Sequence, residues 1–200
     1  MKSQFVTLGA FVVLCFMDAG PVFAQGASRI LKIEQSPKRT FSIEHRTNRN
    51  ARHETWLVSS QSRILLFRPS ETEADYDPEL VVSPDEAWIA RNQKRGSNCI
   101  LTMLHRREAP LVYSQIINLE QSSWRYAEKG LRLAPGTVPP FHRTLQAVRW
   151  LDSSSLLLQL SGDNPNGLRL GTWHCVYHVK TRAFSIPAEF AVSNRRALIR

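Results

Sequence analysis

The hydrophobic positions of the chain form short runs separated by Ser, Pro, Asp, Asn and Gly. From Phe41 onward these runs are rich in β-branched and aromatic residues, which is typical of strands joined by turns. Their density predicts an all-β domain of antiparallel strands. We expect strands at residues 41–45, 55–60, 63–67, 79–83, 87–92, 99–105, 111–117, 145–150, 155–160, 172–179 and 183–186.

Residues 172–179 show the strand alternation most clearly. Every second residue from Trp173 to Val179 is apolar and falls on one face of an extended strand. His174 and His178 fall on the other face, about 13 Å apart at about 3.3 Å per residue. One metal ion cannot bind both side chains at that distance, because each ligand lies about 2 Å from the ion.

One segment departs from the strand pattern. Residues 118–133 carry helix-forming side chains, and apolar residues between Leu119 and Leu131 have spacings that a helix places near one face. Gly130 is expected to help end this helix. We therefore predict a single helical insertion at about 118–133 within a β domain that covers 41–200.

The first residues of the chain have the pattern of an export signal. Lys2 is followed by the apolar stretch 5–17, and Val22-Phe23-Ala24 provides a plausible cleavage site. The apolar stretch is too short to span a bilayer comfortably, and no later segment approaches the roughly 20 apolar residues that spanning requires. We expect residues 1–24 to be a cleavable signal peptide, or in the alternative a retained anchor, and the protein to be periplasmic or secreted.

Residues 25–40 are a polar segment between this signal and the β domain. They contain one apolar patch, Ile30-Leu31-Lys32-Ile33. The pattern leaves two interpretations open, an edge strand or a loose N-terminal arm.

The net charge of +9 indicates an anionic partner. Removing residues 1–24 takes away one basic and one acidic residue, so the charge belongs to the remaining chain. Export argues against nucleic acid and favours a protein, an anionic polysaccharide or lipid headgroups, unless the arginines only solvate the surface. The candidate binding residues are Arg46, Arg49 and Arg52 in a turn, Arg91, Lys94 and Arg95 in a hairpin loop, and Arg106 and Arg107 at a strand end.

The sequence contains no motif that assigns a catalytic residue, a metal or a cofactor. A nucleophile elbow, a zinc-protease helix, a phosphate loop and a dinucleotide fingerprint are all missing. The alternating acidic residues of 71–79 lack the EF-hand order and are expected to form a solvated loop. Cys99 and Cys175 either form one disulfide or remain buried free thiols, and the sequence leaves both open.

Two segments of the chain share residues at fixed offsets. Residues 56–63 and 88–95 both place Trp, an aliphatic residue, Gln and Arg in the same order, 32 residues apart. A third, partial copy begins at Asp152 and matches the segment that begins at Asp85. These matches predict a repeated β unit.

Residues 82–90 (Val-Ser-Pro-Asp-Glu-Ala-Trp-Ile-Ala) resemble the blade turn of TolB-like and WD-repeat β-propellers. The resemblance covers about 79–117 and, less closely, 145–186. It implies propeller-blade-like sheets that do not close a full ring, because only three units are detectable. The family usually has Gly where this chain has Glu86, and its closing Trp-Asp pair is absent. A β-sandwich is the alternative.

Three functions fit these features. The first is an exported, non-enzymatic binding or scaffolding protein with a basic surface. The alternative is a hydrolase that acts on an anionic glycan, for which a deep pocket with a carboxylate pair or a His–carboxylate pair is the expected signature. A shallow, arginine-lined face without such a pair would favour the binding protein. The third is a structural domain of an envelope complex, for which we expect an exposed apolar patch or an open sheet edge.

Overall fold

The computed structural model describes residues 28–70, 76–96, 98–137, 141–163 and 167–199. These residues form an all-β molecule of antiparallel sheets with a helical insertion, as the sequence predicts. The expected signal peptide lies outside the described residues. Among the helices that are described, none is long and apolar enough to cross a membrane.

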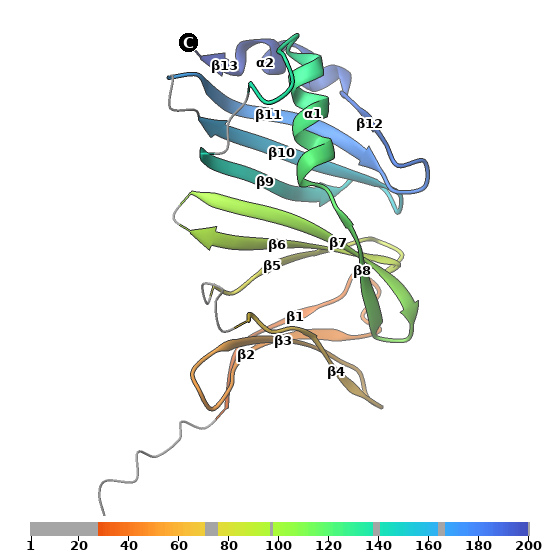
Figure 1. Cartoon of the computed structure of the whole chain (residues 1–200). Helices are drawn as coiled ribbons and strands as arrows, with labels where there is room; N and C mark the ends of the chain where they lie inside the picture. Colours follow the sequence, from red (N-terminus) through yellow and green to blue (C-terminus); the bar gives the residue numbers. More distant parts are fainter. Residues whose placement is uncertain (1–27, 71–75, 97, 138–140, 164–166, 200) are drawn as a thin grey trace, which may run out of the picture.

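The strands form three four-stranded units in chain order (Figure 1). Every predicted strand is present, because each apolar run is bounded by turn-forming residues. The first unit comprises β1 (Arg29–Gln35), β2 (Ser42–Thr47), β3 (His53–Val58) and β4 (Arg63–Phe67). The second comprises β5 (Glu79–Val82), β6 (Trp88–Gly96), β7 (Cys99–Ala109) and β8 (Val112–Asn118). The third comprises β9 (Phe141–Trp150), β10 (Ser155–Asp163), β11 (Arg169–His178) and β12 (Ala183–Ser185).

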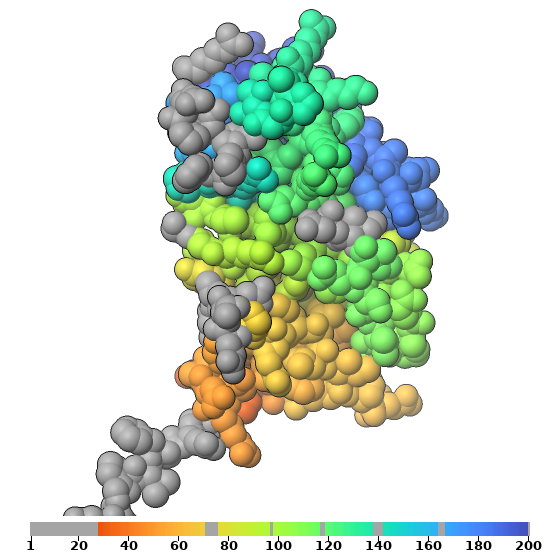
Figure 2. Space-filling view, viewed as in Figure 1, coloured from red at the N-terminus to blue at the C-terminus, as the bar shows by residue number. Residues whose placement is uncertain are grey.

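Neighbouring units pack against each other in a stack, and Figure 2 shows them layered in sequence order. Phe41, Ile43 and Leu57 of the first unit form one core cluster with Leu80 and Ile89 of the second. A larger cluster joins the second and third units. The strand β9 lies beside β7, with a parallel pairing between Ile100 and Thr144 that links the second and third units into one sheet.

The helical insertion is α1 (Glu120–Gly130), which lies inside the predicted segment. It covers the third unit with Trp124 and Ala127, both of which are buried. Gly130 lies against Trp173 so closely that an added Cβ would come within 3.3 Å of the ring. A glycine at the end of α1 therefore lets the helix approach β11.

The C-terminal residues form three short elements that the sequence pattern does not predict. They are a 3₁₀ turn (Ala188–Phe190), α2 (Ala191–Arg196) and β13 (Leu198–Ile199), which pairs with β11. The open question about residues 25–40 is also answered, because β1 is an edge strand that pairs with β2.

The Ser-Pro turn occurs twice in the structure. In the β5–β6 turn the Ser83 N–H bonds to the Trp88 carbonyl, and the Trp88 N–H bonds to the Ser83 Oγ, both at 2.9 Å. The β1–β2 turn repeats these bonds between Ser36 and Phe41, at 3.0 and 3.2 Å. The first and second units thus have the same turn between their first and second strands.

This equivalence corrects the repeat of 32 residues. Trp56 lies on β3, the third strand of its unit, whereas Trp88 lies on β6, the second strand of its unit. Residues 56–63 run from the end of β3 through a turn to the start of β4, whereas residues 88–95 all lie in β6, so the shared letters do not mark equivalent positions. The structural counterpart of Trp88 is Phe41. The match between Asp85 and Asp152 is confirmed, because each carboxylate accepts a backbone N–H two residues later, at 3.1 and 2.6 Å.

The two described cysteines are free thiols. Cys175 is fully buried in the larger core, and burial raises its pKa to about 12. The expected alternation of β11 is confirmed, since its alternate residues from Trp173 to Val179 are buried. The structure therefore favours packing, not a disulfide, as the role of Cys175.

Candidate functional site

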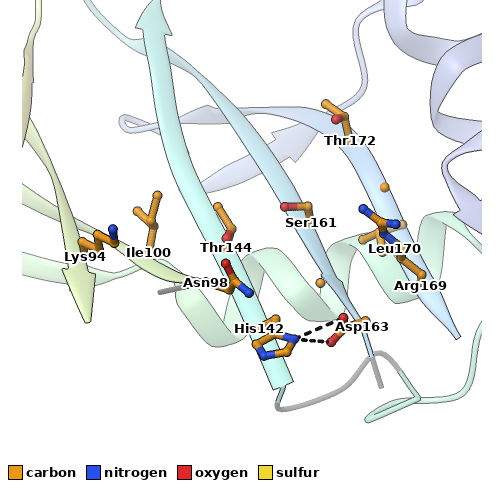
Figure 3. Close-up of a pocket in the computed structure, with 12 residues that line it drawn as sticks. Lys94, Asn98, Ile100, His142, Thr144, Ser161, Asp163, Arg169, Leu170 and Thr172 are labelled. Atoms are coloured by element: carbon orange, nitrogen blue, oxygen red, sulfur yellow. Dashed lines mark hydrogen bonds and ion pairs between the residues drawn. The ribbon is translucent and has the colours of Figure 1, made fainter. Parts of the chain in front are cut away.

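A cavity of about 520 Å³ lies between the β6–β7 hairpin and the strands β9, β10 and β11 (Figure 3). Its size falls within the range of ligand pockets, roughly 300–1,000 Å³. The lining residues come from five strands and one turn. They are Lys94, Asn98, Ile100, His142, Thr144, Ser161, Gly162, Asp163, Arg169, Leu170, Gly171 and Thr172.

Strand alternation explains which side chains reach this cavity. Gly162 turns its backbone toward α1, where an added Cβ would lie 3.3 Å from Trp124. Its neighbour Ser161 therefore points to the opposite face, as does its cross-strand partner Thr144. The hydroxyl groups of both residues line the cavity on the side of the sheet away from the helix.

His142 and Asp163 form a pair at the edge of the cavity. The His142 Nδ1 lies 3.0 and 3.2 Å from the two carboxylate oxygens of Asp163, and both side chains are about half exposed. His142 adopts a left-handed backbone with a φ of 48°. Non-glycine residues rarely adopt this conformation, and such strain is often found at ligand sites.

Two cations enter the cavity from different elements. Lys94 comes from β6, and its ammonium lies 4.8 Å from the centre of the Tyr76 ring. Arg169 comes from the start of β11 and is exposed. Asp163 is the one carboxylate among the lining residues, so the two cations give the site a net positive charge. Neighbouring amide and hydroxyl groups offer further hydrogen bonds. The arrangement suits an oxygen-rich anionic group.

The predicted basic residues divide between the two ends of the sheets. Lys94 lines the cavity, and Arg95 is its exposed neighbour. The β2–β3 hairpin, which carries Arg49 and Arg52, lies on the same side of the molecule as the β6–β7 hairpin (Figure 1). The Arg52 guanidinium donates to the Ser70 carbonyl at 2.5 Å.

Arg106 and Arg107 lie at the far end of the β6–β7 hairpin. Arg106 pairs in register with Trp88 at the start of β6, whereas Lys94 pairs with Ile100 near its end. The eight basic residues therefore do not converge on one surface. Arg106 is also bound to a carboxylate, that of Glu108, at 3.1 Å.

Two of the predicted residues are engaged within the fold. Arg91 was expected in a hairpin loop, but it lies within β6 and is only 5% exposed. Its guanidinium stacks 3.8 Å from the centre of the Phe67 ring, between the first and second units. Arg46 was expected in a turn, but it lies within β2 and is bound to Glu44 at 2.6 Å. The alternation of β6 directs Arg91 inward, which the loop assignment missed.

Sequence reasoning did not identify His142, Asp163 or Arg169. They are scattered over three strands, and no local motif connects them. The antiparallel register brings them together, because Asp163 pairs with Arg169 on one side and with Phe141, the neighbour of His142, on the other. Predicting the register of the β9–β10 hairpin from the sequence would have placed His142 near Asp163.

Within the described part of the chain, no group of three or more His, Cys, Asp or Glu side chains is placed to hold a metal ion. The acidic run 71–79 is only partly described. Its Asp77 lies 2.6 Å from the His45 Nδ1, and its Glu79 accepts a hydrogen bond from Asn92 at 3.0 Å. Residues 71–75 of that run lie outside the described residues.

We find no match for the chain among known protein families, curated proteins or solved structures. The cavity is therefore interpreted from its own residues.

Proposed function

We propose that the protein is an exported, non-enzymatic binding protein that takes an anionic group into the cavity between the β6–β7 hairpin and β9–β11. The observation that carries the proposal is the entry of Lys94 and Arg169 from two different elements into one cavity of about 520 Å³. Because the two cations come from separate strands, the fold sets their backbone positions and an anion in the cavity can be bound from two sides. The ligand classes that fit are an anionic polysaccharide, a lipid headgroup or an acidic protein segment.

The overall charge supports this proposal. The net charge of +9 attracts anionic partners from a distance, and the cavity provides a place where such a partner is held. Ser161 and Thr144 add hydroxyl groups that can bind sugar hydroxyls or anionic oxygens. An anionic polysaccharide uses both kinds of group and is the partner we favour.

The three stacked units support a propeller-like architecture for this binding protein. Each is a four-stranded antiparallel meander, and the first two begin with the same Ser-Pro turn. Glu86, at the position where propeller turns usually have Gly, has a left-handed φ of 61°. Its backbone conformation is the one that glycine adopts most readily.

Retention on a heparin-type resin tests the proposal. We expect the protein to bind at low ionic strength and to elute above about 0.15 M salt, where surface charges are screened beyond roughly 8 Å. Replacing Lys94 and Arg169 by Gln is expected to lower the eluting salt concentration. Elution of the unmodified protein below about 0.15 M salt would count against an anionic partner.

A hydrolase that acts on an anionic glycan is the second candidate. The pair of His142 and Asp163 favours it, because a carboxylate can orient a histidine as a general base. Incubation with anionic polysaccharides and an assay for new reducing ends tests this activity. Release of reducing ends that His142→Gln abolishes would support the hydrolase, and binding without release supports the binding protein.

A further inference from the structure

The edge strand β1 exposes an unusual number of apolar side chains. Ile30, Leu31 and Ile33 are 42%, 44% and 54% exposed. No other stretch of four described residues exposes three large hydrophobic side chains. Within the described chain β2 is the one strand that pairs with β1, so the other edge of β1 offers its backbone groups for pairing.

The outer face of the same sheet is covered by its own side chains. Arg63 stacks over the Trp56 ring with its guanidinium 5.2 Å from the ring centre. Glu44 binds both Arg63 and Arg46, the latter at 2.6 Å. The apolar surface that remains open is therefore at the edge of the sheet.

A bulge sets the direction of the side chains on this edge. Ile30 pairs with Arg46 of β2 and Lys32 pairs with His45, so Leu31 is an extra residue without a cross-strand partner. In a regular strand, residues 30 and 33 would point to opposite faces.

The bulge brings the two isoleucines to the same face. Ile30 lies opposite Arg46 and Ile33 lies opposite Glu44, and these two partners are two residues apart on β2. Lys32 lies on the other face, where its ammonium binds Glu34 at 2.6 Å.

We propose that two copies of the protein associate by antiparallel pairing of their β1 edges around a twofold axis. The bulged Leu31 does not count as a paired position, so a register centred on Lys32 places Ile30 of one copy opposite Ile33 of the other, on the same face. The same register places Arg29 opposite Glu34 of the second copy. Two apolar pairs and two opposite-charge pairs thus form from one self-complementary edge. They flank Lys32, which meets its own copy at the axis in a like-charge pair that weakens the contact.

Twofold pairing also limits the assembly to a dimer. Each copy contributes its β1 edge once, so the contact closes and does not continue into a fibre. The bulge restricts other pairings, since bulges are a common protection of edge strands. The contact is small, so we expect a reversible dimer that depends on protein concentration.

Sedimentation equilibrium over a concentration series tests the dimer. Ile33→Lys places an unpaired charge in the contact and should raise the dissociation constant at least about tenfold. Ile199→Lys is the matched control, because Ile199 lies on β13 and is 52% exposed. A monomer at every concentration, or a dimer that Ile33→Lys does not weaken, would overturn the proposal.

A cysteine cross-link tests the register. Lys32→Cys, in a Cys99→Ser background, places the new thiol opposite its own copy at the distance between paired strands, where an interchain disulfide fits. Val192→Cys, at an exposed position on α2, is the control. Oxidation should link Lys32→Cys far more than the control, and equal linkage would overturn the register. Circular dichroism of each variant verifies that it is folded.

Discussion

Asn92 on β6 holds Ala147 on β9 through both ends of its side-chain amide. The Asn92 Nδ2 donates to the Ala147 carbonyl at 2.8 Å, and the Asn92 Oδ1 accepts the Ala147 N–H at 2.8 Å. Thr102 adds a hydrogen bond to the Leu145 carbonyl at 2.9 Å. Side chains of the second unit thus form hydrogen bonds with backbone groups of β9, at the edge of the third unit.

Asn92→Ala should destabilise the protein by about 2–4 kcal/mol, because it leaves buried backbone groups of Ala147 without full hydrogen bonding. Urea denaturation measures the loss of unfolding free energy. Asn50→Ala, the same substitution in an exposed turn, is the control and should change stability by no more than about 0.5 kcal/mol. Equal effects of the two variants would contradict this role of Asn92.

Asn194 on α2 forms the same kind of contact with His174 on β11. Its Oδ1 accepts the His174 N–H at 2.8 Å, and its Nδ2 donates to the His174 carbonyl at 2.7 Å. Asn194→Ala should release the C-terminal segment while the rest of the protein stays folded. Hydrogen exchange should accelerate in α2 and β13 and stay unchanged in β6 and β7. Unchanged exchange in α2 would show that the contact does not hold the helix.

Glu86 links the first two units. It is buried, and it accepts hydrogen bonds from the Lys38 backbone at 2.9 Å and from the Thr40 hydroxyl. Burial alone raises the pKa of Glu86, but hydrogen bonds from Ser36, Thr40 and the Lys38 backbone outweigh it and lower the pKa. A lowered pKa stabilises the folded state above the pKa of the unfolded chain, and the contribution is lost as the pH falls through the folded pKa.

Glu86→Gln should therefore lower the unfolding free energy by about 1–3 kcal/mol at pH 7. The difference from the unmodified protein should shrink as the pH falls below about 4.5, the ordinary pKa of a glutamate. Glu108→Gln, at an exposed position, is the control. A difference that is independent of pH would contradict the part played by the charge.

His105 makes stability depend on pH in a different range. Burial, and then the charge of Arg91, lower the pKa of His105 from 6.5 to about 4. The unfolded chain binds a proton on this residue below about pH 6.5, and the folded chain does not until about pH 4. Stability should fall by about 3 kcal/mol over this interval. His105→Gln should remove that slope, which denaturation curves at several pH values measure, and an unchanged slope would contradict the assignment.

Much of the fold follows from local sequence. Strands were predictable because each apolar run ends at a residue that favours a turn, and α1 was predictable from its helical spacing. The structural role of Asp85 was also visible, because an aspartate in a turn binds nearby backbone N–H groups.

Contacts between units were not predictable in the same way. Similar letters around Trp56 and Trp88 suggested one repeat, but the hydrogen bonds of the turns relate Trp88 to Phe41. His142 and Asp163 meet through the register of two strands, which depends on pairing over a distance and on bulges. The cavity therefore appears only when the strands are assembled.

The proposal that the cavity binds an anion is tested most directly by equilibrium binding of a sulfated heparin-type oligosaccharide to two charge-neutralised variants. One variant carries Lys94→Gln and Arg169→Gln inside the cavity. The other carries Arg106→Gln and Arg107→Gln at the opposite end and has the same net charge. We predict at least about tenfold weaker binding for the cavity variant and nearly unchanged binding for the other. Equal weakening of both variants would show that general surface charge, and not the cavity, binds the anion.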